Sequence, residues 1–341
     1  MNKTILQKPT VIELFAGGGG MALGFERAGF QHVLLNDNNR RCCETLQRNR
    51  PHWPVWKRDI KTIDFTSFYR QVDVVTGGFP CQAFSNAGKR RGFEDERGML
   101  IFEFLRAIFE IQPKIFIAEN VKGLFNDKTL DTINDVYRIL TERGYNVLSP
   151  EVLQAANYRV PQLRERVIIV GVRSDIAANF EFEKPNDTIF TLHDALKAGK
   201  LYSTDVPESE GSQYSDKKCQ ILSQVPAGGN WKDLSLDALK AYLGDWHEHV
   251  HGSQIARRLS WDKPSYTLMT TPSSRLIDRC HPDETRPLTV REYARLQTFP
   301  DDWQFAGGLT AQYRQIGNAV PVNLAESLAQ AALKTLQQHS Q

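Results

Sequence analysis

A cysteine that follows a strand-like run is the residue of this chain best placed to carry out chemistry. The run Val72–Thr76 is rich in β-branched residues, which predicts a buried strand, and two glycines and a proline then end it. Cys81 follows, so we expect it at the carboxyl end of a sheet strand, the edge where open α/β sheets bind ligands. Taken alone, a free cysteine is more often a small buried residue. A chemical role therefore requires an activating group, a cofactor and a substrate surface elsewhere in the chain.

Two further sets of polar side chains could supply such a site. Glu119 follows the apolar strand Ile115–Ala118, and neighbouring strands of a parallel sheet share one edge, so we expect Glu119 near Cys81. A partly buried glutamate has a raised pKa and can donate a proton near neutral pH, although Glu119 could instead cap the next segment. Arg164 and Arg166 are two residues apart in extended chain and would point the same way, offering two forked donors to an anion or a base carbonyl.

A glycine-rich turn near the start of the chain is typical of a nucleotide-type site. An apolar strand over residues 10–15 leads through Ala16–Gly20 into a helix over 21–28. Glycines let the backbone approach a ligand and leave the helix N-terminus facing it. The spacing fits neither the dinucleotide fingerprint nor a P-loop, and a tight connection is the alternative.

Acidic residues follow the next two segments. Asp37 ends a strand over residues 32–36, where folds of this kind hold a ribose hydroxyl pair, although Asp37 or Asn38 could simply cap the following helix. Asp59 and Ile60 are suited to an adenine, because the acid accepts from the exocyclic amine and the apolar side chain packs on the ring.

Composition bounds the compartment and the partners. The chain has 341 residues, enough for two domains, and a net charge of +2 that says little about partners. No signal peptide and no stretch long enough to span a bilayer is visible. Five cysteines form neither a disulfide framework nor a zinc pattern, and the alternating His247, His249 and His251 lack further ligands, so we expect a cytoplasmic protein without a metal.

The alternation of strands and helices stops at about residue 175, and residues 175–288 are polar and irregular. From residue 251 to 279, four arginines accompany hydroxyl side chains, a mixture that contacts phosphates and reads guanine edges. They are Arg257, Arg258, Arg275 and Arg279. The stretch Ser85–Gly98 is predicted to be a long surface loop. Its basic triplet, Lys89–Arg91, could contact phosphates or could simply be solvated. Order returns with a helix over 289–297, with Thr289 and Glu292 as a capping box, and a last amphipathic helix over roughly 322–337.

Taken in order, these motifs resemble the DNA (cytosine-5) methyltransferase family, and closely its short bacterial restriction–modification type. The residues that carry the resemblance are Phe15–Gly20, Gly77–Ser85, Glu119–Val121, Gln162–Arg166, Arg291–Gln297 and Gly317–Pro321. Each motif is weak alone, but the ordered set is specific and spans roughly residues 1–172 and 286–335.

The resemblance implies an α/β fold: a doubly wound, Rossmann-like methyltransferase domain with a mostly parallel sheet and a smaller irregular or β-rich target-recognition domain. It divides the chain into a catalytic and cofactor-binding domain over 1–174, a recognition domain over 175–288, and a segment over 289–341 that returns to the first domain. The final helix would then pack on the first domain beside the cofactor.

The resemblance also implies an activity and roles for the residues. The enzyme would transfer a methyl group from S-adenosylmethionine to C5 of a flipped-out cytosine in double-stranded DNA, through a covalent bond from Cys81 to C6. Glu119 would hold the base at N3, Arg164 its O2, and Arg166 would be a weaker candidate for the same role. The cofactor set would be Phe15, Gly17, Gly19, Asp37, Asn38, Asp59, Ile60, Pro80 and Asn318. The DNA-binding set would add Ser85 and Arg97 to the four arginines.

The implied partners are DNA and a restriction endonuclease against which the enzyme protects that DNA; we expect a monomer and no membrane partner. Two alternatives stay open. One is a tRNA cytosine methyltransferase of the same fold, and the other is a catalytically silent DNA-binding protein, against which the intact Cys81, Glu119 and Arg164 argue.

Overall fold

The structure is a computed structural model that describes residues 8–80, 99–124, 130–252, 254–274 and 277–339. The chain divides into two compact units. The first comprises Met1–Gln154, Glu165–Pro185 and Val322–Gln341, and the second comprises Ala155–Arg164 and Asn186–Pro321. Each unit is described by itself below.

The first unit is built on a mainly parallel sheet in the order β3-β2-β1-β4-β5-β9-β6, with β7 also paired to β9. The five parallel strands are β1 (Thr10–Leu14), β2 (Gln31–Asp37), β3 (Val55–Lys57), β4 (Val74–Gly77) and β5 (Ile115–Asn120). The antiparallel strands are β6 (Tyr145–Val147), β7 (Glu151–Gln154) and β9 (Glu165–Arg173). This confirms the predicted α/β class.

Two short strands pair with the same neighbour in the sheet. β6 and β7 are separated by a few residues, and both pair with β9. Pro150 lies between them. Because proline has no N–H to donate to a ladder, it interrupts the pairing at this point.

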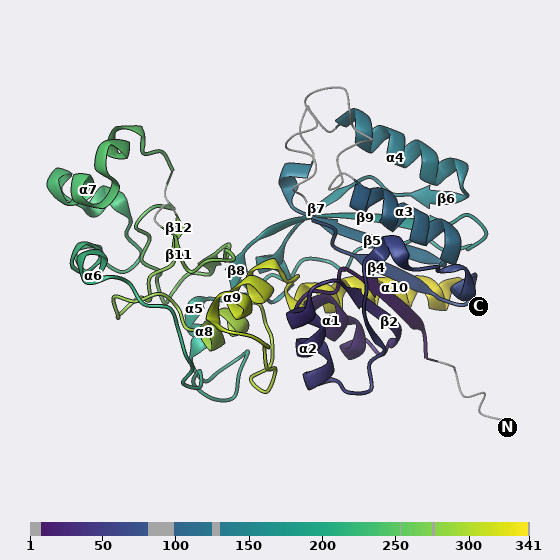
Figure 1. Cartoon of the computed structure of the whole chain (residues 1–341), viewed down its shortest axis with the longest axis horizontal. Helices are drawn as coiled ribbons and strands as arrows, with labels where there is room; N and C mark the ends of the chain where they lie inside the picture. Colours follow the sequence, from purple (N-terminus) through teal and green to yellow (C-terminus); the bar gives the residue numbers. More distant parts are fainter. Residues whose placement is uncertain (1–7, 81–98, 125–129, 253, 275–276, 340–341) are drawn as a thin grey trace. The chain divides into compact units, whose positions relative to one another are not determined.

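Helices cover both faces of the sheet (Figure 1). One face carries α3 (Met99–Ile111) and α4 (Leu130–Glu142), and the other carries α1 (Gly20–Arg27), α2 (Arg40–Asn49) and α10 (Val322–His339). The core on the first face joins Leu14 and Val75 of the sheet to Phe104 of α3 and Ile133 of α4.

The final helix packs on the first unit, as expected. α10 lies against α1 so closely that a Cβ at Gly24 would be 2.5 Å from the Cβ of Ala325. No helix among the described residues is long and apolar enough to cross a membrane.

The second unit consists of short elements joined by irregular chain. Its helices are α5 (Leu192–Leu196), α6 (Asp216–Leu222), α7 (Leu236–Leu243), α8 (Val290–Leu296) and α9 (Leu309–Asn318). Its strands, two residues each, form the pairs β8 (Gln162–Leu163) with β10 (Ser265–Tyr266) and β11 (Ser273–Ser274) with β12 (Ile277–Asp278). The expected irregular character is therefore present, whereas the described part is not rich in β-structure.

The expected capping box of α8 is confirmed. The Thr289 hydroxyl accepts from the Glu292 N–H, and the Glu292 carboxylate accepts from the Thr289 N–H. Sequence analysis did not predict α9.

The two units divide the chain differently from the expected boundaries. Residues 289–321, expected with the first domain, belong to the second unit, and of the final segment only α10 lies in the first. Arg295 gives the physical reason. Its guanidinium is fully buried, pairs with Asp301 at 2.6 Å, and donates to the carbonyl oxygens of Ala195 and Thr204, which ties α8 to the start of the second unit.

Candidate active site at the carboxyl edge of the sheet

The carboxyl ends of β4 and β5 form the core of the candidate site. Gly77 and Ala118 are partners in the parallel register, so the chain leaves β4 through Gly78–Pro80 directly beside Glu119. The Asn120 side chain donates to the carbonyl oxygen of Phe79 at 3.0 Å, which fixes this exit. Cys81, Ser85 and Arg97 lie outside the described residues. The expected shared edge is therefore present up to Pro80, the residue before the cysteine.

Glu119 is held by an arginine. Its side chain is only 8% exposed, and its Oε1 lies 2.7 Å from Nε of Arg166, which is also buried. Arg166 in addition donates through Nη1 to the carbonyl oxygen of Glu165 at 2.7 Å. A buried carboxylate with an arginine partner is compensated for its loss of hydration, which is the condition for keeping it in an apolar site.

Arg164 has other partners. It is 1% exposed and donates to the carbonyl oxygens of Leu268 at 3.2 Å, Gly317 at 2.7 Å and Ala319 at 3.1 Å, all in the second unit. The expectation that both arginines face one ligand is therefore not met, because β9 begins between them and the two side chains bind different groups. Arg166, the weaker candidate by sequence, is the one that the structure brings to Glu119.

The glycine turn after β1 has a backbone that favours glycine. Gly17 and Gly19 have φ of 55° and 86°, and Phe15 adopts φ of 58°, which is uncommon for a residue with a side chain. Strained backbone of this kind is concentrated at functional sites. Gly18 and Gly20 are buried, whereas Phe15 and Gly17 are partly exposed.

Asp37 is bound to this turn. Its Oδ2 accepts from the N–H of Gly17 at 2.8 Å, and its Oδ1 accepts from the N–H of Asn39 at 2.7 Å. Burial raises the pKa of Asp37 above its ordinary value, and these two hydrogen bonds act in the opposite direction. Each carboxylate oxygen keeps a second lone pair, so Asp37 can still accept from a ligand.

The remaining residues of the expected cofactor set differ in their exposure to solvent. Asn38 is exposed, and Asn39 rather than Asp37 or Asn38 caps α2. Asp59 is exposed and caps the short helix η1 (Ile60–Thr62). The Ile60 side chain is part of the core, and its packing on a ligand stays a prediction. Pro80 is exposed, and so is Asn318, which belongs to the second unit.

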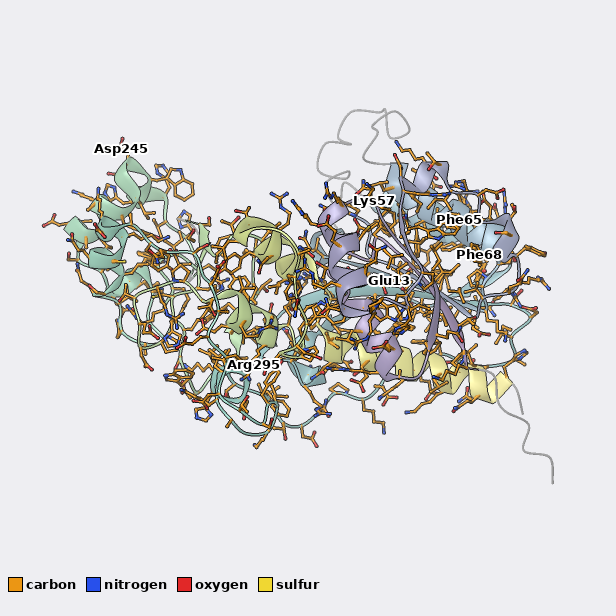
Figure 2. All side chains as sticks on the ribbon, turned by 60° about the horizontal axis from the view of Figure 1, so that its bottom comes forward. Glu13, Lys57, Phe65, Phe68, Asp245 and Arg295 are labelled. Carbon is orange, nitrogen blue, oxygen red and sulfur yellow. The ribbon has the colours of Figure 1, made fainter. Side chains whose placement is uncertain are left out.

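Sequence analysis missed Glu13, a carboxyl group in the interior of the first unit (Figure 2). It is 2% exposed, and its Oε2 has no hydrogen-bond partner among the described residues. Burial raises its pKa well above the ordinary value, and the charge of Asp37 adds to this effect. The available signal was an acidic residue inside a buried strand, three residues before the glycine turn.

A second cluster of motif residues lies within the second unit. Gln162 donates to Gln297 Oε1 at 3.0 Å, and Gln297 in turn donates to the carbonyl oxygens of Ile316 and Ala319. Arg164 donates to the same 317–319 stretch. These motifs, far apart in sequence, therefore converge on one buried hydrogen-bond network.

The arginines expected to contact DNA are mostly buried. Arg257, Arg258 and Arg279 are 6%, 5% and 2% exposed, and Arg275 lies outside the described residues. Arg258 donates to the carbonyl oxygens of Val225 at 2.7 Å, Leu222 at 2.8 Å and His281 at 3.0 Å. Burial contradicts the expectation that these three side chains meet DNA in this conformation. Sequence analysis erred because an arginine among hydroxyls looks the same whether its acceptors are phosphates or backbone carbonyls.

Residues 9–334 match the family model described as C-5 cytosine-specific DNA methylase. The chain is 54% identical to the type II methyltransferase M.Eco47II of Escherichia coli, with 96% of the chain and 79% of that protein covered. It is 44% identical to the type II methyltransferase M.Sau96I of Staphylococcus aureus, with coverage of 96% and 76%.

Solved structures match the fold. A putative DNA modification methyltransferase encoded within an E. coli prophage has a TM-score of 0.71 at 24% identity, covering 96% of this chain and 99% of its own. The Dnmt2 methyltransferase of S. pombe has a TM-score of 0.63 at 19% identity, with coverage of 97% and 99%.

Proposed function

The chain belongs to the C-5 cytosine-specific DNA methylase family, and from this premise we propose that Cys81, Glu119 and Arg166 are the residues that act on the cytosine. The protein is a DNA (cytosine-5) methyltransferase that uses S-adenosylmethionine. The observation that carries the assignment of roles is the Glu119–Arg166 pair at 2.7 Å beside the chain that leads into Cys81.

The residues around the glycine turn fit a cofactor with an adenosine part. Asp37 is fixed by two backbone N–H groups and keeps lone pairs for the ribose hydroxyls. Phe15 and Gly17 are partly exposed beside it, and Asp59 presents a carboxylate that can accept from the adenine amine. Asn38, Gly19, Pro80 and Asn318 stay predictions for the same site, and Ile60 would contribute through its backbone. When bound, S-adenosylmethionine supplies an electrophilic methyl group.

The chain's own residues prepare the cytosine for this methyl group. The Cys81 thiolate adds to C6, which makes C5 nucleophilic; this is covalent catalysis that divides one difficult step into easier ones. Glu119 holds N3 and the exocyclic amine, so electrons of the ring move towards N3 as the sulfur attacks. After C5 has gained the methyl group, a base removes the C5 proton, the C5–C6 double bond re-forms and Cys81 leaves.

Arg166 orients Glu119 and balances its charge, because its Nε lies 2.7 Å from Oε1 of the carboxylate. Arg164 donates to carbonyl oxygens within the second unit. We therefore assign the direct role to Arg166 and a structural role to Arg164.

The substrate is DNA, and the target base must leave the stack because C5 and C6 are not accessible in a duplex. Ser85 and Arg97 stay predictions for DNA contacts. We infer that the second unit, Ala155–Arg164 and Asn186–Pro321, reads the sequence, that the enzyme acts as a monomer in the cytoplasm, and that it protects DNA from a partner restriction endonuclease. The type II names of its relatives support this last inference.

Base-resolution methylation sequencing of plasmid DNA from cells that express the protein tests the proposal. We expect methylcytosine at one short recurring site, lost in Cys81→Ala and retained in Cys219→Ala, a matched cysteine change in the second unit. Absence of methylation with folded wild-type protein that binds S-adenosylmethionine would contradict it and would direct the search to tRNA or to a silent DNA-binding role.

A further inference from the structure

We propose that Gly78 is a positioning residue for the reaction: its lack of a side chain creates the space in which the second carboxylate oxygen of Glu119 lies. The inference rests on the proposed role of Glu119 and adds a requirement to it. A Cβ at Gly78 would lie 2.8 Å from Glu119 Oε2, closer than real Cβ atoms approach an oxygen.

Two residues, Arg166 and Gly78, thus determine the position of the Glu119 carboxylate. Arg166 Nε lies 2.7 Å from Oε1 and fixes one oxygen. The bare backbone at Gly78 admits the other, Oε2, against the chain that leads to Pro80. Because Oε2 is the oxygen that lies against Gly78, in the chain that leads to Cys81, we assign to it the contact with the base, and Gly78 decides where this oxygen can be.

The backbone conformation does not explain the glycine. Gly78 does not have the positive φ that makes a side chain unfavourable at Gly17 or Gly19. Among the described residues, the three nearest atoms within 4 Å of an added Cβ all belong to Glu119: Oε2 at 2.8 Å, the carbonyl oxygen at 3.9 Å and Cδ at 4.0 Å. An alanine is therefore compatible with the local backbone and conflicts with the catalytic carboxylate.

Other closely packed glycines of the described chain have structural neighbours. A Cβ at Gly24 would meet the backbone of α10 at 2.6 Å, and one at Gly317 would meet the carbonyl oxygen of Met269 at 2.5 Å. One at Gly77 would meet the Phe104 ring at 2.7 Å. At those positions a methyl group damages packing, whereas at Gly78 it meets the end of a side chain that can rotate away. The Gly78→Ala substitution should therefore lower the rate of catalysis and leave the fold intact.

The test is a double-mutant cycle of Gly78→Ala with Glu119→Asp. In Gly78→Ala we expect a roughly 100-fold lower kcat for methyl transfer, since a misplacement of about 1 Å has this effect on catalysis, with an unchanged Kd for S-adenosylmethionine. Aspartate is one methylene shorter and withdraws the carboxylate from the added methyl group. In the Glu119→Asp background, Gly78→Ala should therefore change kcat by less than about 3-fold.

The matched control is Gly123→Ala, because an added Cβ there meets none of the described residues within 4 Å. We expect its kcat, cofactor Kd and Tm to equal those of the wild type. A kcat of Gly78→Ala within about 3-fold of the wild type would overturn the inference. An equal loss in both Glu119 backgrounds would also overturn it, because Gly78 would then act without Glu119.

Failure to fold in both backgrounds would overturn the inference as well, since the conflict would then be with the backbone. These outcomes differ from a failure of the proposed function, in which the wild-type protein itself would not methylate DNA.

Discussion

At the scale of single residues, the partner of a guanidinium group decides its role in this protein. Arg166 meets the carboxylate of Glu119, which places it with the reacting groups. Arg164 and Arg258 meet backbone carbonyl oxygens, which places them with the groups that hold loops together. A buried carbonyl without a donor costs about 1–3 kcal/mol, so each of these arginines stabilises its surroundings substantially.

Arg258→Lys should therefore affect folding rather than DNA contact. A single ammonium group cannot reach the separate carbonyl oxygens of Leu222, Val225 and His281, so we expect the free energy of unfolding to fall by about 3 kcal/mol. Urea unfolding measures this, with the exposed Arg314→Lys in the same unit as the control. A fully stable variant with weaker DNA binding would contradict the structural role.

His32 should make the stability of the first unit dependent on pH. Burial lowers the pKa of His32 from its ordinary value of 6.5 to about 3, and nearby His52 adds to the shift. Its Nε2 has no hydrogen-bond partner among the described residues, and its ring contacts Trp53 at 4.7 Å between centroids. The unfolded chain therefore takes up the proton first, so stability is complete above pH 6.5 and is lost as the pH falls towards 3.

We expect the wild type to lose about 2 kcal/mol more than His32→Phe between pH 7 and pH 5, measured by urea unfolding at both values. The control is His339→Asn, a change at an exposed histidine of the same unit. Equal pH dependence in the wild type and His32→Phe would show that His32 is not the group responsible.

At the scale of elements, two opposing contributions to the free energy of unfolding meet at Gly24, where α1 contacts α10. They are helix propensity and overpacking. Alanine is favoured over glycine inside a helix by about 1 kcal/mol, so Gly24→Ala would normally stabilise α1. Here the added Cβ would lie 2.5 Å from Ala325 Cβ and 2.6 Å from the Glu326 nitrogen, and overpacking of this kind costs about 1–3 kcal/mol.

We therefore expect Gly24→Ala to destabilise the protein by up to about 2 kcal/mol, measured by urea unfolding. Gly199→Ala, where an added Cβ meets nothing within 4 Å, should change stability little. A more stable Gly24→Ala variant would mean that helix propensity outweighs the contact with α10.

Much of the first unit could be predicted from the sequence, because its central strands have a recognisable pattern. Parallel strands buried on both faces appear as continuous apolar runs, so β1, β4 and β5 were recognisable, and their shared edge placed Glu119 beside the chain that precedes Cys81. The roles of the arginines could not be predicted. The acceptors of Arg164 lie 104 to 155 residues further along the chain, and no local pattern reveals them.

At the scale of the whole molecule, the first unit is assembled from three stretches of chain, and the second unit lies between them in sequence. Its last stretch contributes buried Leu324, Ala325 and Leu328 to the face of the sheet that α1 covers. Without α10 these contacts are lost and α1 exposes Gly24 and its neighbours to water.

A chain that ends at Pro321 should therefore fail to bind S-adenosylmethionine and should lack the cooperative unfolding of the first unit, as measured by calorimetric titration and thermal unfolding. A chain that ends at His339 should behave like the full-length protein. Tight cofactor binding by the chain that ends at Pro321 would show that the first unit is complete without α10.

The position of α10 also bears on how the protein is made. A ribosome synthesises residues 186–321 before it reaches Val322, so the second unit has all its residues while the first still lacks its final helix. Domains fold as units during synthesis, generally from the N-terminus onwards. Here the N-terminal sheet must instead wait, with the α1 surface uncovered, until α10 has left the ribosome. Rapid release of α10, or protection of that surface by a chaperone, would therefore determine the yield of active enzyme.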